Sequence, residues 1–201
     1  MIRVLIADDQ AMIRGALATL LSLEDDIDVV AQCGSGDEVL DAITRTTPDV
    51  CLLDIEMPGM SGLEVAELLS TQAPLCRVII VTTFGRPGFV SRAMKAGAAG
   101  FVVKDTPAEE LATAVRSVHA GGKVIDPALA AESMMEGSNP LSEREVEVLR
   151  RAATGATART IAAELYVSAG TVRNHISAAM RKLDASNRTQ AIDIARERGW
   201  L

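Results

Sequence analysis

The sequence has few cysteines and no long apolar run. Cys33, Cys51 and Cys76 are odd in number and lack the spacing of zinc ligands, so we expect neither a disulfide framework nor a zinc site. All three are expected to be reduced thiols in the core. No apolar stretch approaches the roughly 18 residues of a membrane span, and acidic residues from Asp8 onward interrupt any secretory signal. These absences predict a soluble, cytoplasmic protein with no direct membrane association.

Positive charge is scarce and unevenly placed. The formal net charge of the 201 residues is -7 at pH 7. Residues 1–140 carry a net charge of -10, whereas residues 141–201 carry +3. This asymmetry predicts two domains with different partners, and the C-terminal one is the better candidate for binding nucleic acid.

Short apolar runs alternate with helical patterns through the first part of the chain. The five runs cover residues 2–7, 27–31, 50–53, 78–81 and 101–103. The run at 50–53 lacks polar alternation, which is typical of a strand buried on both faces, and each run is followed by apolar residues at helical spacing. We therefore predict an α/β domain over residues 1–122, with a doubly wound, flavodoxin-like, five-stranded parallel sheet.

Polar side chains lie at the ends of four of these runs: Asp8 and Asp9, Asp54, Thr82 and Lys104. The carboxyl ends of parallel strands form the edge where open α/β sheets bind ligands, so we expect these groups to lie close together. Three neighbouring carboxylates repel one another unless some are protonated or a cation lies among them. Carboxylate oxygens suit a hard divalent ion, and the predicted cofactor is Mg²⁺.

The polar residues expected at this edge of the sheet predict phosphoryl transfer. A phosphate held by a metal beside a carboxylate permits attack on phosphorus, which gives an aspartyl phosphate. Asp54 lies in mid-sheet and is the predicted nucleophile, whereas Asp8 and Asp9 are the predicted metal-side groups. Lys104 would neutralise one phosphate oxygen and Thr82 would donate a hydrogen bond to another. Asp8 also has an alternative role as a solvated helix cap.

Residues 141–201 have four helical patterns in place of strands. The expected helices run from the capping box of Ser142 and Glu145 to Gly155, from 158 to 165, from 169 to 183 and from 188 to 198. The second and third are joined by a tight turn, and the third carries polar and basic residues on its outer side. This pattern is typical of a helix-turn-helix. The predicted DNA-binding residues are Thr171, Arg173, Asn174, His175, Ser177 and Lys182.

A linker separates the two domains. Residues 123–140 change in composition, with a short helix expected from Pro127 to about Met135 and a break at 137–140. The predicted domain boundaries are therefore 1–122, 123–140 and 141–201.

The combination of Asp8 and Asp9, of Asp54 followed by Ile-Glu-Met-Pro-Gly, and of Thr82 and Lys104 resembles the receiver domain of bacterial two-component response regulators. The resemblance implies that a sensor histidine kinase donates a phosphate to Asp54, and that the protein is a regulator with at most slow self-dephosphorylation.

The same resemblance implies a ligand set and a switch residue. Mg²⁺ would be bound by Asp9, Asp54 and the backbone carbonyl of Glu56, with Asp8 acting through water. Phe101, three residues before Lys104, occupies the position of the aromatic switch residue of receivers.

Sequence motifs in the C-terminal part of the chain also resemble a known family. Leu-Ser-Glu-Arg-Glu at 141–145, Ile-Ala-Ala-Glu-Leu at 161–165 and the stretch 168–176 resemble the four-helix DNA-binding domain of LuxR/NarL/FixJ regulators. That resemblance implies a homodimer that forms on phosphorylation and binds double-stranded DNA. Residues 83–89, 170–174 and 199–200 are similar to regulators of membrane-lipid desaturation, which implies a role in lipid control.

Two other functions fit parts of the sequence. A Mg²⁺-dependent phosphatase with an aspartate nucleophile would use the same edge, although Glu56 stands where the second aspartate of such a motif belongs. A regulator that no longer uses phosphate is the second alternative. The sequence also leaves two candidate dimer surfaces. One is formed by the helices at 11–23 and 108–120, and the other is the surface that follows the fourth strand.

Overall fold

The structure is a computed structural model that describes residues 1–83, 87–126, 129–130 and 139–201. The chain divides into two compact units, an α/β unit that carries the sheet and a C-terminal helical unit. The helix expected from Pro127 to about Met135 falls almost entirely outside the described residues. None of the described helices is long and apolar enough to cross a membrane.

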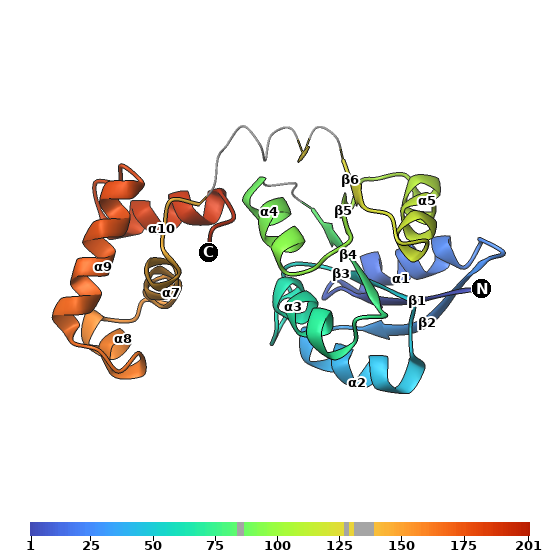
Figure 1. Cartoon of the computed structure of the whole chain (residues 1–201), viewed down its shortest axis with the longest axis horizontal. Helices are drawn as coiled ribbons and strands as arrows, with labels where there is room; N and C mark the ends of the chain where they lie inside the picture. The colour runs from blue at the N-terminus through green and yellow to red at the C-terminus, as the bar shows by residue number, and fades with distance from the viewer. Residues whose placement is uncertain (84–86, 127–128, 131–138) are drawn as a thin grey trace. The chain divides into compact units, whose positions relative to one another are not determined.

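The α/β unit is built on a parallel sheet whose described strands follow the order β2-β1-β3-β4-β5-β6 (Figure 1). The strands are β1 (Ile2–Ala7), β2 (Ile27–Cys33), β3 (Val50–Leu53), β4 (Arg77–Thr82), β5 (Gly100–Val103) and β6 (Val124–Ile125). All four residues of β3 are buried, because helices cover both faces of the sheet. The order reverses between β1 and β3, and such a reversal marks the ligand-binding edge of open α/β sheets.

The sheet has one strand more than the five that the sequence predicts. β6 pairs in parallel with β5 through Gly100 with Val124 and Phe101 with Ile125. This strand lies inside the stretch predicted as linker, and its two residues are only half-buried. A strand of two residues has no periodicity to detect, so its pairing depends on the free edge of β5. The predicted doubly wound, flavodoxin-like fold is otherwise confirmed.

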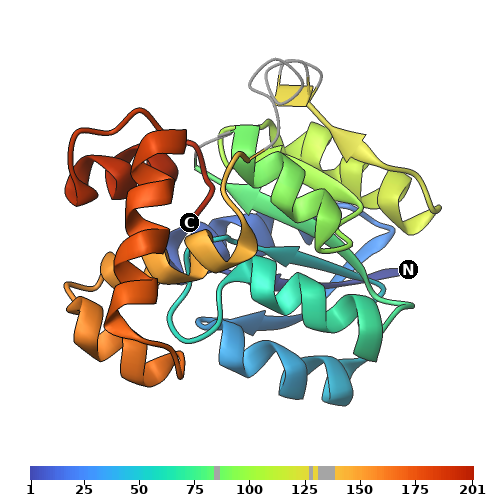
Figure 2. The same ribbon diagram turned by 60° about the vertical axis from the view of Figure 1, so that its left-hand side comes forward.

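Five of the described helices cover the sheet: α1 (Ala11–Leu21), α2 (Gly36–Thr46), α3 (Gly62–Gln72), α4 (Pro87–Lys95) and α5 (Ala108–His119). α1 and α5 pack on one face, and α2, α3 and α4 lie on the other (Figure 2). Val4 and Ile6 of β1 belong to the core under α1 and α5. Leu5, between them, is also fully buried, so successive residues fill two cores and the strand shows no alternation of polarity.

The helical unit contains α7 (Glu143–Ala152), α8 (Ala158–Glu164), α9 (Ala169–Lys182) and α10 (Arg188–Glu197). Each begins at a side-chain cap: Ser142, Thr157, Ser168 and Asn187. The predicted capping box of Ser142 and Glu145 is present. A separate core forms around residues such as Leu149, Ile161 and Val172, and Trp200 is buried in it. The predicted all-α four-helix unit is confirmed.

Candidate functional site

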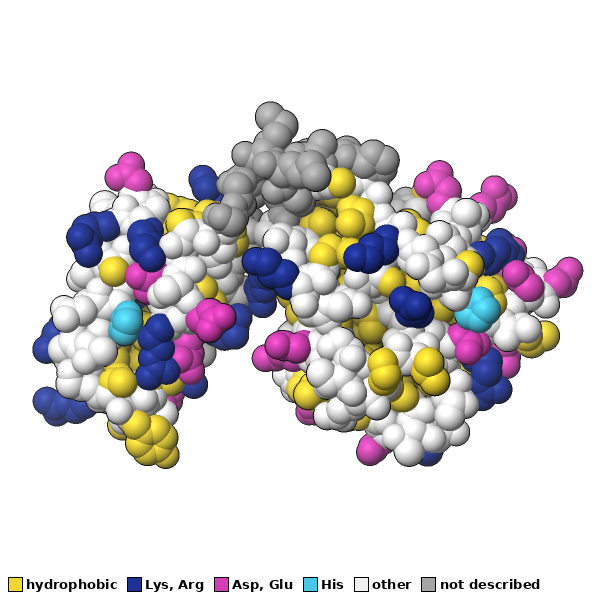
Figure 3. All heavy atoms as spheres, in the orientation of Figure 1, with side chains coloured by type: hydrophobic (Ala, Val, Ile, Leu, Met, Phe, Trp, Pro, Cys, Tyr) yellow, Lys and Arg dark blue, Asp and Glu magenta, His cyan; other side chains and the backbone are white. Residues whose placement is uncertain are grey.

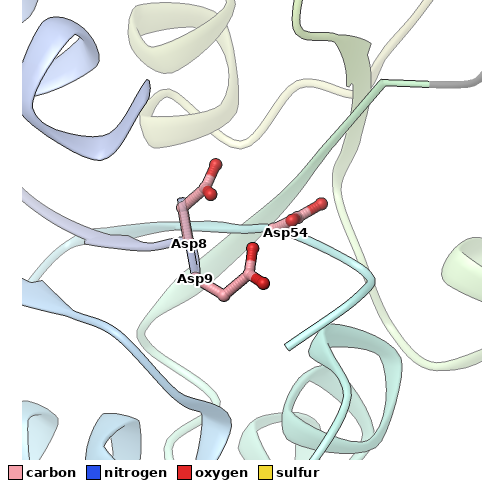
Figure 4. Close-up of side chains that lie close together, drawn as sticks. All are labelled: Asp8, Asp9 and Asp54. Carbon is pink, nitrogen blue, oxygen red and sulfur yellow. The ribbon is translucent and has the colours of Figure 1, made fainter. Parts of the chain in front are cut away.

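Three carboxylates gather at the C-terminal edge of the sheet (Figure 4). Asp8 and Asp9 follow β1, and Asp54 follows the neighbouring strand β3. One oxygen atom from each lies within 4.8 Å of the other two. Asp8 and Asp54 are buried, whereas Asp9 is exposed. The structure therefore brings together the residues that the sequence predicts at this edge.

Backbone hydrogen bonds continue beyond the strands and fix two of these residues. The Asp54 amide donates to the carbonyl of Ala7 at 2.9 Å, and the Asp8 amide donates to that of Cys33 at 3.1 Å. The Asp54 Oδ1 atom accepts a hydrogen bond from the amide of Ile55 at 2.8 Å. Asp54 Oδ1 is thus held by the backbone, which leaves its Oδ2 atom facing another partner.

That partner is Lys104, which follows β5. Its Nζ atom lies 2.9 Å from Asp54 Oδ2 and 2.7 Å from Asp8 Oδ2. The three side chains are between 2% and 6% exposed, so this is a buried ion-pair network. One ammonium beside three carboxylates leaves an excess of negative charge, and a divalent cation would balance it.

Burial and charge shift the titration of this network. Desolvation by burial raises the pKa of the Asp54 carboxyl, helped by the nearby charge of Asp8 and opposed by Lys104. Burial lowers the pKa of the Lys104 ammonium, but hydrogen bonds to Asp8 and Asp54 outweigh it and leave the pKa above its usual value. Lys104 is therefore charged at neutral pH.

The donor set fits Mg²⁺. All three groups are carboxylates, which are the hard oxygen ligands that this ion prefers, and the exposed Asp9 opens the cluster to water. The side chain of Glu56 is exposed and does not belong to the cluster. Its predicted contribution is through its backbone carbonyl, and that role stays a prediction.

The loop after Asp54 depends on residues that the sequence analysis missed. A Cβ atom on Gly62 would lie 1.9 Å from the carbonyl oxygen of Asp54, so only glycine fits there. The Asp37 carboxylate on α2 accepts a hydrogen bond from the Met60 amide at 3.2 Å. Gly36 donates to the carbonyl of Pro58 at 3.2 Å. Contacts between residues so distant in sequence cannot be recognised from a local sequence pattern. The glycines at 36 and 62 are the one local indication that the backbone is closely approached at these positions.

Thr82 lies on β4, the strand next to β3, and Phe101 lies on β5, on the far side of β4. Thr82 is the last residue of β4 and is 6% exposed, and its carbonyl accepts a hydrogen bond from the Lys104 amide at 2.7 Å. Phe101 is fully buried in β5, in register with Ile80 of β4. An aromatic ring in this position is part of the core, so any movement of it would repack the sheet interior.

The outer side of α9 carries the residues predicted to contact DNA. Arg173, Asn174 and Ser177 are exposed, and Thr171 and His175 are partly buried. Figure 3 shows Lys and Arg side chains scattered with acidic ones over the visible face of the helical unit. The Ser168 hydroxyl caps α9 by accepting a hydrogen bond from the Thr171 amide at 3.0 Å.

Lys182 also has a structural partner. Its Nζ atom lies 2.7 Å from Oε2 of Glu145 on α7, whose side chain is 7% exposed. Burial raises the pKa of the Glu145 carboxyl, but hydrogen bonds from Lys182 and Ser142 outweigh it and lower the pKa overall. Lys182 therefore joins α9 to α7, and sequence spacing alone did not indicate this ion pair.

Comparison with known proteins identifies both units. Residues 4–116 match the response regulator receiver domain, and residues 139–195 match the luxR family of bacterial regulatory proteins. The chain belongs to the LuxR-type response regulators. The predicted family is thereby confirmed.

Full-length relatives of this response regulator occur in Bacillus subtilis (strain 168). The chain is 51% identical to the uncharacterized transcriptional regulatory protein YvfU and 48% identical to the transcriptional regulatory protein DesR, over all of each chain. A receiver joined to a LuxR-type domain makes this response regulator a DNA-binding regulator of transcription.

Solved structures of response regulators have the same fold. The crystal structure of ChrA, from a heme-sensing two-component system, is 34% identical, with a TM-score of 0.59 and coverage of 100% of this chain and 98% of that one. The response regulator RcsB in complex with DNA is 23% identical, with a TM-score of 0.67 and coverage of 98% of each chain. At 23% identity, the comparison with RcsB shows only that the two proteins share a fold.

Proposed function

We propose that this regulator is switched by phosphorylation of Asp54, with a sensor histidine kinase as phosphate donor and Mg²⁺ as cofactor. The observation that carries the proposal is the pairing of Lys104 with both Asp54 and Asp8 beside Asp9. We place this chemistry in a cytoplasmic receiver that extends past the predicted boundary at residue 122 to include β6, followed by a DNA-binding domain at 141–201.

Each residue of the edge has a defined part in the reaction. A carboxylate oxygen of Asp54 attacks the phosphorus of the donor, and the bond from phosphorus to the histidine nitrogen breaks. Mg²⁺ held by Asp9 and Asp54, with Asp8 nearby, would neutralise charge on the transferred phosphoryl group. Lys104 then pairs with a phosphoryl oxygen in place of the Asp54 carboxylate.

Two neighbours would transmit the change. The Thr82 hydroxyl donates a hydrogen bond to another phosphoryl oxygen, at the end of the strand next to β3. Phe101 is in register with Ile80, which lies two residues before Thr82 on that strand. A shift of Thr82 would therefore change the packing of the aromatic ring. Phosphorylation in this scheme biases two existing arrangements of the receiver.

DNA would be bound by α9 in the major groove. Arg173 and Asn174 have the donors and acceptors that distinguish bases, and Ser177 lies one turn further along. Thr171, His175 and Lys182 would contribute phosphate contacts, with Lys182 shared with Glu145. The C-terminal charge of +3 is small for one domain, so two copies on paired half-sites would add their phosphate contacts.

A homodimer supplies those two copies. Leu20 near the C-terminal end of α1 and Leu23 in the turn after it are exposed, and Arg116 of α5 binds Glu24 and Asp26 just beyond them. An exposed apolar pair next to an ordered ion-pair network supports the α1 and α5 surface as the dimer interface over the surface after β4.

The test is phosphorylation of the purified chain by acetyl phosphate with Mg²⁺, followed by light scattering. Wild type should become dimeric, and Asp54→Ala should remain monomeric. Absence of phosphorylation in wild type would contradict the mechanism. Continuous turnover of a phosphoester would favour the phosphatase alternative, and equal DNA binding by both proteins would favour a phosphate-independent regulator. Control of lipid genes stays a prediction, to be checked by transcript profiles of a deletion strain.

A further inference from the structure

Two cysteine thiols meet in the interior of the α/β unit, away from the acidic cluster. The Sγ atoms of Cys51 and Cys76 lie 3.2 Å apart. Cys51 is in the middle of β3 and fully buried, and Cys76 immediately precedes β4 and is 9% exposed. Among the described residues, Cys33 is as buried as these two but has no sulfur contact with either.

Strand pairing holds the two thiols together. Cys51 is in register with Val78 of β4, two residues after Cys76. The Arg77 amide donates to the carbonyl of Asp49 at 2.8 Å, and the Cys76 amide donates to that of Ala73 at 2.9 Å. The sulfur atoms therefore need to approach by only roughly 1 Å to reach bonding distance. Two buried thiols with no role in the receiver chemistry are thus left in contact.

We propose that Cys51 and Cys76 form a disulfide that ties β3 to β4 when the protein meets a hydroperoxide. The tie joins β3, which Asp54 follows, to β4, whose last residue is Thr82. Protein disulfides in reducing compartments are usually transient and redox-responsive, which fits free thiols as the resting state.

The order of the steps follows from exposure and acidity. Cys76 is the more accessible thiol, and its hydrogen bond with Cys51 lowers the pKa of Cys76. Its sulfur attacks one peroxide oxygen, the O–O bond breaks, and Cys76 becomes a sulfenic acid as one water leaves. The sulfur of Cys51 then attacks that of Cys76, the S–O bond breaks, and a second water leaves. Two thiols lose two electrons to one hydrogen peroxide.

The disulfide can be detected by tryptic mapping, because trypsin places the proposed pair and Cys33 in different peptides. Cys51 and Cys76 fall in one peptide, 46–77, and Cys33 falls in another, 15–45. The reduced native chain is treated with hydrogen peroxide, unfolded, and labelled with N-ethylmaleimide before digestion. Peptide 46–77 should carry no N-ethylmaleimide label. After reduction with dithiothreitol and a second addition of N-ethylmaleimide, it should carry two. Peptide 15–45 should carry its single label from the first addition. Oxidation of methionine in 46–77 adds oxygen but leaves the label count unchanged.

Single variants test the pairing. Cys33→Ala should form the bond at the wild-type rate, and Cys51→Ala should leave a sulfenic acid on Cys76 that dimedone traps. Two labels on oxidised peptide 46–77 would overturn the proposal, as would a sulfinic acid on Cys76 in the wild-type chain without loss of the Cys51 label. Loss of the Cys33 label at the same rate would also overturn it, because oxidation would then be unselective.

Discussion

The Nζ atom of Lys104 lies 2.9 Å from Oδ2 of Asp54 and bridges it to Asp8. One buried ammonium thus holds the proposed phosphate acceptor in place before any phosphate arrives. The same ammonium is proposed to pair with the phosphoryl group afterwards, so it is present in both states of the switch.

Removing this ammonium should make stability depend more strongly on Mg²⁺ than it does in wild type. Lys104→Met leaves two buried carboxylates unpaired, and the free energy of unfolding should fall by about 3 kcal/mol in a Mg²⁺-free buffer. Added Mg²⁺ should recover part of the loss, because the ion takes the place of the lost charge. Thermal unfolding with and without Mg²⁺ measures both effects. Lys95→Met, at an exposed position on α4, should change neither.

Gly62 should be far less replaceable than Gly15. Gly62→Ala places a methyl group 1.9 Å from the backbone oxygen of Asp54, and the free energy of unfolding should fall by about 2 kcal/mol. Phosphorylation of Asp54 should slow as well, because its backbone must move. Gly15→Ala, in α1 with nothing within 4 Å, should stabilise by roughly 0.5–1 kcal/mol. Urea unfolding distinguishes them, and equal effects would contradict the steric argument.

The ion pair of Glu145 with Lys182 should make the helical unit sensitive to acid. The folded state lowers the pKa of Glu145, so its contribution is present above the unfolded value of about 4.3 and is lost as pH falls through the folded value. Trp200 is the single tryptophan and is buried in this unit, so its fluorescence reports the unfolding directly. Glu145→Gln should flatten the pH dependence in this range, and an unchanged slope would contradict the assignment.

Arg173 should contribute to DNA binding, whereas Arg150 should not. Both are exposed arginines of the helical unit, on α9 and α7 respectively. Arg173→Ala should weaken operator binding at least about tenfold, because it removes a contact to base edges. Arg150→Ala removes the same charge and should have little effect. Fluorescence anisotropy with labelled operator DNA compares the two, and equal losses would indicate that only net charge matters.

The dimer surface can be probed with one new charge. Leu23→Asp, next to the C-terminal end of α1, should abolish dimer formation by phosphorylated protein without changing the stability of the monomer. Leu75→Asp is the control, since Leu75 is 91% exposed between α3 and β4. Light scattering after acetyl phosphate treatment gives the answer. A dimer that tolerates Leu23→Asp would direct attention to the surface after β4.

Much of the fold was predictable because it depends on local patterns. The runs at 2–7 and 50–53 were found with the bounds of β1 and β3, since apolar strands between helices have a clear signature. Ser142 and Glu145 form the predicted capping box, which is a signal within four residues. β6 was missed, because its two residues are a strand only through their pairing with β5.

The candidate site shows the same division. By itself, the sequence determined the two domain types and the polar residues at the strand ends, because strand polarity and sheet order bring those ends to one edge. Only the tertiary structure decided that Lys104 binds both Asp8 and Asp54, that Asp37 holds the loop after Asp54, and that Cys51 touches Cys76. Such contacts join residues 23 to 96 positions apart, and side-chain packing across neighbouring elements, which no local pattern encodes, selects the pairs.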